Sequence, residues 1–267
     1  MFAYASCRDA FAQGSQRMGI KKMNYQEIAV DKIDGVASTG EPLLRKPDIS
    51  ILFALEGKRA RKVVSRSNAK ATGKYPSWKA GRMVHYESIH ELNAFRLLDA
   101  CHEVKSFREQ PCRIDYVLNG EKHSHFPDIL VELACGSELL EVKTEFDAAK
   151  PEVAKRTEFM MKALPHLGFN YRLVTAEKLA QNPRQDNVRH FIKFGFKPVS
   201  LVRREHVRQL FKDAGEIRWG ALTFGNDGRE LRDAVCRLVL EGFLRFDFNQ
   251  PMSPDSLVRV VDQKDGV

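Results

Sequence analysis

The stretch Phe126-Pro127-Asp128-Ile129-Leu130-Val131-Glu132-Leu133, followed after a four-residue break by Glu138-Leu139-Leu140-Glu141-Val142-Lys143, decides the fold of this chain. Two apolar segments with a short break between them predict the strands of a β-hairpin. Residues alternate between the two faces of a strand, so Glu141 and Lys143 share one face of the second strand. The hairpin is therefore predicted to carry an Asp, a Glu and a Lys on one face.

The register of this hairpin decides how close its charged side chains come. A turn at residues 134–137 sets Leu133 opposite Glu138 and, counting back, Asp128 opposite Lys143. Glu141 is then a diagonal neighbour of Asp128, with the bases of the two side chains roughly 7 Å apart or less. A bound cation bridges carboxylates at such a separation.

These residue types match the chemistry of phosphodiester hydrolysis. Mg²⁺ binds one or two carboxylates together with substrate phosphate, and it activates water. Asp128 and Glu141 are the predicted ligands, with the main-chain carbonyl of Val142 as a further one. Lys143 is predicted to orient or deprotonate the attacking water or to hold the phosphate, because a strand fixes it in place. The pattern alone is weak, and an exposed face of an edge strand is the structural alternative.

A helix is predicted over residues 87–102, where apolar residues recur without Gly or Pro. Glu91 falls in the same stripe as Ala94, Phe95, Leu98 and Cys101, and a carboxylate there is costly unless it is paired or bound to metal. Glu91 is therefore a candidate catalytic acid and metal ligand. The alternative is a capping box, because Ser88 precedes it by three residues.

The remaining elements predict an α/β fold with a mixed sheet. Asn119-Gly120 is a two-residue hairpin signal, and strand, helix, strand follow in order after Lys143. Strands are predicted at 103–107, 110–118, 122–133 and 171–175, and helices at 151–164 and 183–194. His123 and His125 share one strand face and form a weaker metal candidate. Residues 1–56 contain no motif.

The end of the chain has a different pattern. Helices are predicted at 204–214 and 228–241, and strands at 243–248 and 256–261. Two helices followed by a hairpin are the order of a winged-helix module, which binds DNA or protein.

Positive charge is concentrated in one segment. Residues 57–86 carry +9 while the whole chain carries +8, so the remainder sums to −1. Such a segment is typical of a flexible arm on a nucleic-acid backbone, and a solvated linker is the alternative. The predicted DNA-binding residues of the arm are Lys58, Arg59, Arg61, Lys62, Arg66, Lys70, Lys74, Lys79 and Arg82.

Other features limit the class of protein. The five cysteines are widely spaced without Cys-x-x-Cys, which argues against a disulfide framework or a zinc knuckle. No apolar run is long enough to span a membrane, and the start has no clear signal-peptide region. A cytoplasmic protein with reduced cysteines and no membrane contact is expected.

Several short motifs occur together in a fixed order. They are Tyr86-Glu87-Ser88-Ile89-His90-Glu91-Leu92, Phe107-Arg108-Glu109-Gln110-Pro111, Phe126-Pro127-Asp128, Leu140-Glu141-Val142-Lys143, Tyr171-Arg172-Leu173-Val174-Thr175 with Asn187, and Leu240-Glu241-Gly242-Phe243-Leu244-Arg245-Phe246. With Pro-Asp, a gap and Glu-x-Lys, the chain resembles the restriction-endonuclease-like superfamily. Within it, the chain resembles the TnsA-like endonuclease subunits of heteromeric cut-and-paste transposases, from about Tyr75 onward.

The resemblance implies roles for named residues. Glu91 is the catalytic acid, Asp128 the metal-binding acid and Lys143 the catalytic lysine, while Gln110 joins the DNA-binding residues. Some relatives have Gln at position 141, so Glu141 as a direct ligand rests on the wider superfamily pattern. Mg²⁺ is the implied cofactor, with Mn²⁺ as a substitute.

The resemblance also implies a cellular role. The chain would cut the 5′ side of transposon ends while a separate transposase subunit cuts and joins the 3′ side, and an AAA-type ATPase regulator would bind the C-terminal part. The alternatives are a stand-alone restriction- or phage-type DNA nuclease and a non-catalytic DNA-binding bridging protein. The expected domains are an N-terminal segment (1–56), a basic arm (57–86), a nuclease core (87–195) and a winged-helix-like domain (196–267).

Overall fold

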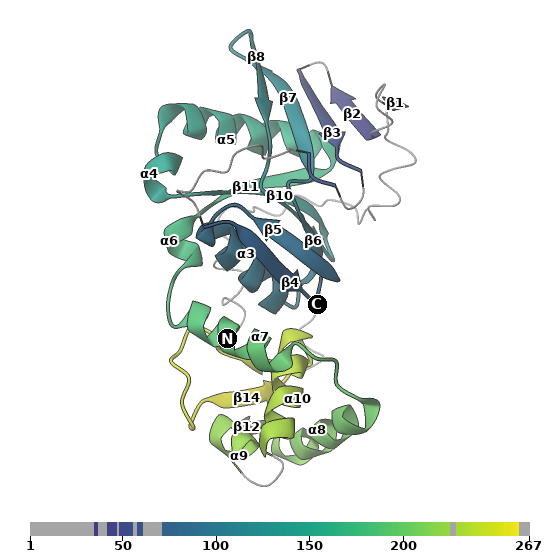
Figure 1. Ribbon diagram of the computed structural model, residues 1–267, viewed down its shortest axis with the longest axis vertical. Coiled ribbons are helices and arrows are strands. Elements are labelled where there is room, and N and C mark those ends of the chain that lie inside the picture. Colours follow the sequence, from purple (N-terminus) through teal and green to yellow (C-terminus); the bar gives the residue numbers. More distant parts are fainter. Residues whose placement is uncertain are drawn as a thin grey trace. The chain divides into compact units, whose positions relative to one another are not determined.

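The computed structural model describes residues 35–36, 42–46, 48–55, 58–60, 71–224 and 228–261 (Figure 1). These residues fall into two compact units. The first unit contains the described residues up to Leu92 together with Val104–Lys178, and the second contains Asn93–Glu103 and the described residues from Leu179 onward.

One antiparallel sheet of the first unit includes strands for which the sequence predicted no structure. Strands β2 and β3 pair with each other, and β3 pairs with β7, so the segment before residue 57 completes the sheet. The strand order is β1-β2-β3-β7-β8. The strands are β1 (Gly35–Val36), β2 (Pro42–Lys46), β3 (Ile49–Phe53), β7 (Cys112–Leu118) and β8 (Glu121–His125).

The second sheet of this unit is mixed, which confirms the α/β prediction. Strand β10 runs parallel to β11 and antiparallel to β9, and the order is β11-β10-β9-β6. The strands are β6 (Val104–Glu109), β9 (Ile129–Leu133), β10 (Gly136–Lys143) and β11 (Phe169–Thr175). Parallel neighbours need a crossover connection. Here it consists of α4 (Glu145–Ala148), α5 (Pro151–Ala163) and the 3-10 turn η1 (Leu164–Leu167).

The two sheets and α5 share one hydrophobic core. Ile51 of β3 and Ile114 of β7 belong to the same buried cluster as Leu139 of β10, Met160 of α5 and Phe169 of β11. Each of these side chains is almost completely buried. Burying a side chain of this size contributes about 1.5–3 kcal/mol, so the core fixes the position of β10.

The prediction of one strand over residues 122–133 is wrong. The chain forms β8 in one sheet, breaks at residues 126–128 and then forms β9 in the other sheet. Pro127 has no N–H to donate to a ladder, which favours a break at this position. The turn at Asn119-Gly120 is confirmed, because Leu118 pairs with Glu121 across it.

The turn between β9 and β10 is two residues long rather than four. Leu133 pairs with Gly136, whose φ of 138° is in the region that favours glycine. Leu140 pairs with Ile129, so the register continued by one residue sets Asp128 opposite Glu141 instead of Lys143. The difference is two residues, and the face on which each side chain lies is therefore unchanged.

Part of the predicted flexible arm is an ordered hairpin. Strands β4 (Gly73–Ser77) and β5 (Arg82–Tyr86) pair with each other, and Tyr75 and Val84 are buried. The prediction of an open arm is wrong for this stretch, because these apolar side chains supply a buried face. Arg61, Lys62, Arg66 and Lys70 lie outside the described residues.

Helix α3 (Ile89–Ala100) is shorter than predicted, but its apolar stripe is correct. Ala94, Phe95 and Leu98 are at most 1% exposed. Helix α6 (Ala176–Leu179) follows β11.

The second unit has a helix, a strand, two helices and two strands after α7. Strands β12 and β13 flank β14 in an antiparallel sheet, and β12 and α9 were not predicted. Gly195 of α7 packs so closely on α10 that an added Cβ would lie 2.8 Å from the Arg237 nitrogen. Helix α7 therefore belongs to this unit, together with the other described residues from Leu179 onward. The elements are α7 (Arg184–Gly195), α8 (Leu201–Ala214), β12 (Glu216–Arg218), α9 (Trp219–Thr223), α10 (Gly228–Leu240), β13 (Leu244–Phe246) and β14 (Leu257–Val260).

Among the residues that the structure describes, no helix has the length and apolarity needed to cross a bilayer. Cys101, Cys112, Cys135 and Cys236 are free thiols.

Candidate active site

Asp128 is held by three hydrogen bonds, two to β10 and one to the loop between β6 and β7. Its backbone N–H donates to the Leu140 carbonyl at 3.0 Å, and its carbonyl accepts the Gln110 N–H at 2.7 Å. The side-chain oxygen Oδ2 accepts the Val142 N–H at 2.7 Å. Burial, followed by the charge of Glu141, raises the pKa of Asp128, while Lys143 and the Val142 N–H oppose the rise. The break before β9 therefore places a carboxyl group in an unfavourable electrostatic environment.

Glu91 is both a helix cap and a neighbour of Asp128. The Ser88 hydroxyl donates to Glu91 Oε1 at 3.1 Å, and the Glu91 N–H donates to the same hydroxyl at 3.2 Å. Oε2 accepts the N–H of Glu87 at 2.9 Å, one residue before the amide that a capping box predicts. Burial and then the Asp128 charge raise the pKa of Glu91 to about 7. The two interpretations of Glu91 thus coexist.

Glu141 and Lys143 form an ion pair on one face of β10. Lys143 Nζ lies 2.6 Å from Glu141 Oε1. The Glu141 side chain is only 3% exposed, whereas that of Lys143 is 30% exposed. Burial lowers the pKa of Lys143, but the charges of Glu141 and Asp128 outweigh it, and the net shift is upward. Lys143 is therefore an ammonium group, suited to donate hydrogen bonds rather than to accept a proton.

Three further side chains surround Glu141. Arg156 Nη2 of α5 lies 3.5 Å from Glu141 Oε1, and His125 Nε2 of β8 lies 3.4 Å from Oε2. The Tyr171 hydroxyl is 3.0 Å from the same His125 nitrogen. Burial lowers the pKa of His125 to about 3, so its imidazole is neutral. His123 stacks instead on Tyr116.

Gln110 links Asp128 to a further carboxylate. Its side-chain Nε2 donates to Glu87 Oε1 at 2.6 Å, and its backbone has a φ of 41°. A left-handed conformation costs a non-glycine residue on the order of 1–3 kcal/mol and persists only where neighbouring contacts hold it. The side chain is 7% exposed. Gln110 was predicted to bind DNA, but the structure places it inside the unit, bonded to Glu87 and Asp128.

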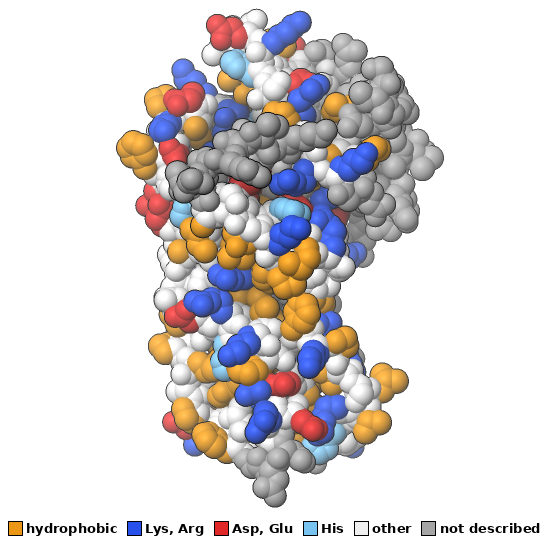
Figure 2. Space-filling view, viewed as in Figure 1, with side chains coloured by type: hydrophobic (Ala, Val, Ile, Leu, Met, Phe, Trp, Pro, Cys, Tyr) orange, Lys and Arg blue, Asp and Glu red, His pale blue; other side chains and the backbone are white. Residues whose placement is uncertain are grey.

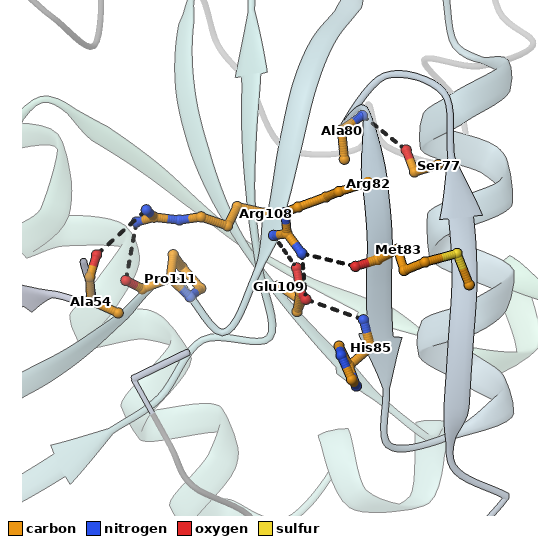
Figure 3. Close-up of polar contacts among 9 residues, drawn as sticks. All are labelled: Ala54, Ser77, Ala80, Arg82, Met83, His85, Arg108, Glu109 and Pro111. Atoms are coloured by element: carbon orange, nitrogen blue, oxygen red, sulfur yellow. Dashed lines mark hydrogen bonds and ion pairs between the residues drawn. The ribbon is translucent and has the colours of Figure 1, made fainter. Parts of the chain in front are cut away.

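Figure 3 shows how the β4–β5 hairpin is attached to the end of β6. Arg82 donates to both oxygens of Glu109, at 2.9 Å and 2.6 Å, and the His85 N–H donates to Glu109 Oε1 at 3.1 Å. Burial raises the pKa of Glu109, but the hydrogen bonds from Arg82 and from backbone N–H groups lower the pKa by more. The net shift is therefore downward. Arg82, predicted to bind phosphate, instead anchors the hairpin beside Gln110.

Other residues of the predicted basic arm face solvent. Lys58 and Lys74 are exposed, and Lys79 Nζ lies 5.3 Å from the Trp78 ring centroid. Figure 2 shows Lys and Arg side chains at many points of the visible face, with Asp and Glu side chains between them. Among the described arm residues, Lys58 and Lys74 are therefore the better candidates for phosphate contacts.

The oxygen atoms at the end of β10 fit a partly hydrated cation. Within the described ranges, no group of three or more His, Cys, Asp or Glu side chains is placed to hold a metal ion. A strand residue directs its N–H and C=O to the same side, and the Val142 N–H bonds Asp128. The Val142 carbonyl therefore points to the Asp128 side. Mg²⁺ commonly binds through one or two carboxylates and keeps waters for substrate phosphate to replace. Glu141 Oε2 is buried without a hydrogen-bond partner in the described part of the chain.

Sequence reasoning found Asp128, Glu141, Lys143 and Glu91, and the structure brings all four together. It missed Arg156, Tyr171 and Glu87. No short motif signals Arg156, because α5 brings it to Glu141 from 15 residues further along the chain.

Residues 101–176 match the family model described as "TnsA-like endonuclease N terminal". The match includes Asp128, Glu141 and Lys143, and it confirms the resemblance predicted from the sequence motifs. A comparison with curated proteins gives no match.

Proposed function

We propose, because residues 101–176 match the TnsA-like endonuclease N-terminal family model, that the chain is a Mg²⁺-dependent DNA endonuclease with a restriction-endonuclease-like core. We further propose that it cuts the 5′ ends of a transposon as one subunit of a heteromeric transposase. The observation that carries the proposal is the convergence of Asp128, Glu141 and Lys143 at the end of β10, beside Glu91.

Each residue has a distinct task. Asp128 and the Val142 carbonyl would hold the metal ion, with Glu91 as the nearby second carboxylate. When bound, Mg²⁺ supplies an acidified water and neutralises charge that develops on the phosphate. Lys143 is an ammonium group in this proposal, and it positions the attacking water or pairs with the scissile phosphate. Glu141 holds Lys143, and its predicted direct contact with the metal stays a prediction.

The second unit is proposed to act as a winged-helix module. The order α8, β12, α9, α10, β13, β14 and the strand order β12-β14-β13 support this assignment. A separate transposase subunit that cuts the 3′ ends, and an AAA-type ATPase regulator bound through this unit, are the proposed partners. DNA is the proposed substrate, with Lys58 and Lys74 as candidate phosphate contacts.

The test is cleavage of a plasmid that carries the ends of the encoding transposon. The full chain is combined with the partner subunit, the ATPase regulator and Mg²⁺, and nicks are mapped on each strand. The wild-type chain is expected to produce 5′ nicks, whereas Asp128→Ala and Lys143→Ala leave only the 3′ nicks of the partner. Glu138→Gln, on the opposite face of β10, is the matched control and should cut normally.

Three other outcomes would contradict the proposal in distinct ways. Cleavage by Asp128→Ala at the wild-type rate would show that the Asp128 carboxylate is not needed for cleavage. Cutting without partners at sites unrelated to the ends would indicate a stand-alone nuclease. DNA binding with no 5′ cleavage by the wild-type chain would indicate a bridging protein.

A further inference from the structure

Glu141 has two cationic partners on the same oxygen. Lys143 Nζ lies 2.6 Å and Arg156 Nη2 lies 3.5 Å from Oε1. On the other oxygen, the nearest group is His125, which is neutral and bonded to Tyr171. Among the described residues, Arg156 is thus the second cation in ion-pair range of Glu141.

The two cations differ in where they can go. The Lys143 side chain is 30% exposed and ends a strand, the Arg156 side chain is 21% exposed and extends from a helix, and Glu141 is 3% exposed. Arg156 extends from α5, which is packed into the hydrophobic core through Met160. Lys143 can therefore reach a substrate at the surface, and Arg156 is the cation that stays with the carboxylate.

A buried carboxylate makes departure of its partner costly. Removing one partner of a buried ion pair leaves an uncompensated charge, which is strongly destabilising. If Lys143 were the only cation near Glu141, its movement to a phosphate would leave such a charge. A second cation at 3.5 Å removes this obstacle.

We propose that Arg156 is a positioning residue that keeps Glu141 paired while the Lys143 side chain moves to form an ion pair with the scissile phosphate. This inference rests on the proposed function. In this proposal Arg156 acts on Lys143 through Glu141 and is assigned no contact with the reacting atoms. In the free protein Lys143 is paired with Glu141, and in the DNA complex it pairs with the scissile phosphate instead.

The first test compares single-turnover cleavage by variants of the two residues. Arg156→Met should slow cleavage about tenfold or more, because Lys143 becomes the sole partner of a buried charge. DNA affinity should be unchanged, and Arg156→Lys should cut at an intermediate rate. In the double variant Glu141→Gln/Arg156→Met, the side chain at position 141 is a neutral amide, so Lys143 is not held by a buried charge. Its rate should match that of Glu141→Gln alone.

The control is Arg172→Met, which breaks the Arg172–Glu138 pair on the opposite face of β10. This variant should lose stability but keep its cleavage rate. The proposal is overturned if Arg156→Met cuts as fast as the wild type, if Glu141→Gln fails to remove the effect of Arg156→Met, or if Arg172→Met slows cleavage equally.

A thermal-unfolding cycle without metal or DNA separates this inference from the proposed function. Arg156→Met should lower the melting temperature, and adding Glu141→Gln should restore most of the loss, because the buried charge is gone. Additive losses would refute the pairing. A wild-type chain that fails to cut refutes the proposed function, and the unfolding cycle still decides whether Arg156 supports Glu141.

Discussion

The two buried glutamates of β10 show how one strand separates a structural ion pair from a candidate catalytic one. Glu138 is paired with Arg172, and both side chains are less than a fifth exposed. Glu141, on the opposite face, lies near Asp128 as well as Lys143 and Arg156. At Glu138, the carboxylate charge is balanced by the charge of the Arg172 guanidinium group. At the Glu141 face, burial raises the pKa values of Glu91, Asp128 and Glu141, and the charge of a neighbouring carboxylate adds to each rise.

This difference teaches that buried charge alone does not mark a functional site. Perturbed carboxyl groups gathered in one place are the more informative signal, because folding gains nothing from mutual repulsion. A divalent cation would relieve that repulsion, whereas the Glu138–Arg172 pair needs no ligand. The two faces should therefore respond in opposite ways to mutation and to metal.

The largest expected effect is on Asp128. Asp128→Asn should reduce DNA cleavage about a thousandfold or more, because a metal ion contributes several kcal/mol of transition-state stabilisation. The same change removes a charge repelled by Glu141, and the amide oxygen can still accept the Val142 N–H. Its melting temperature in metal-free buffer should therefore equal or exceed that of the wild type. A marked loss of stability would show that the charge is structural.

In the absence of DNA, stabilisation by a metal ion should depend on the Asp128 face of β10 and not on the Glu138 face. Saturating Mg²⁺ or Mn²⁺ at about 100 times its dissociation constant stabilises a protein by about 2.7 kcal/mol. The wild type and Glu138→Gln should both gain melting temperature on addition of the ion. Asp128→Asn should not. An equal gain in Asp128→Asn would locate the metal elsewhere.

The Arg82–Glu109 ion pair, like the Arg172–Glu138 pair, joins one cation to one carboxylate, and it lies near the candidate site. Glu109→Gln should cost about 1–3 kcal/mol of unfolding free energy, less than a fully buried pair because Arg82 is about a third exposed. The folded-state pKa of Glu109 is depressed, so its contribution is present above the unfolded value of 4.5 and is lost as pH falls through the folded value. Denaturant unfolding should thus show a smaller difference between variant and wild type at low pH than at pH 7. A pH-independent difference would contradict the ion-pair explanation.

The smallest effect on cleavage is expected at Glu138. Arg172→Met should cost about 1–3 kcal/mol of unfolding free energy and leave cleavage unchanged, since the pair lies on the face away from Lys143. Chemical denaturation and a cleavage assay on the same sample measure both quantities. Reduced cleavage with full stability would show that the two faces of β10 are coupled.

Local patterns in the sequence were sufficient for several parts of the fold. Asn119-Gly120 predicted its turn because few residue pairs adopt two consecutive positive φ angles, here 54° and 81°. Apolar periodicity predicted α3 with its start at residue 87, two residues early, and the capping bonds expected from the spacing of Ser88 and Glu91 are present. The turn length before β10 was predicted incorrectly, and the error was harmless because a shift of two residues preserves the face of every side chain.

Contacts between distant segments could not be predicted in this way. The strands before residue 57 carry no distinctive motif; β3 pairs with β7, and β2 pairs with β3. Arg82 was predicted to contact phosphate, and no local pattern indicated that it donates hydrogen bonds to Glu109 of β6. The left-handed backbone of Gln110 is likewise held by bonds to Asp128 and Glu87, which are remote in sequence.

The sequence by itself determined which residues are candidates for the chemistry, because strand alternation and motif spacing are local properties of the chain. Asp128, Glu141 and Lys143 share a site in any register that keeps their parity. Only the tertiary structure decided which charges are already paired. Arg156 comes to Glu141 through α5 packed in a common core, and the free energy that fixes it there comes from apolar burial across the whole unit.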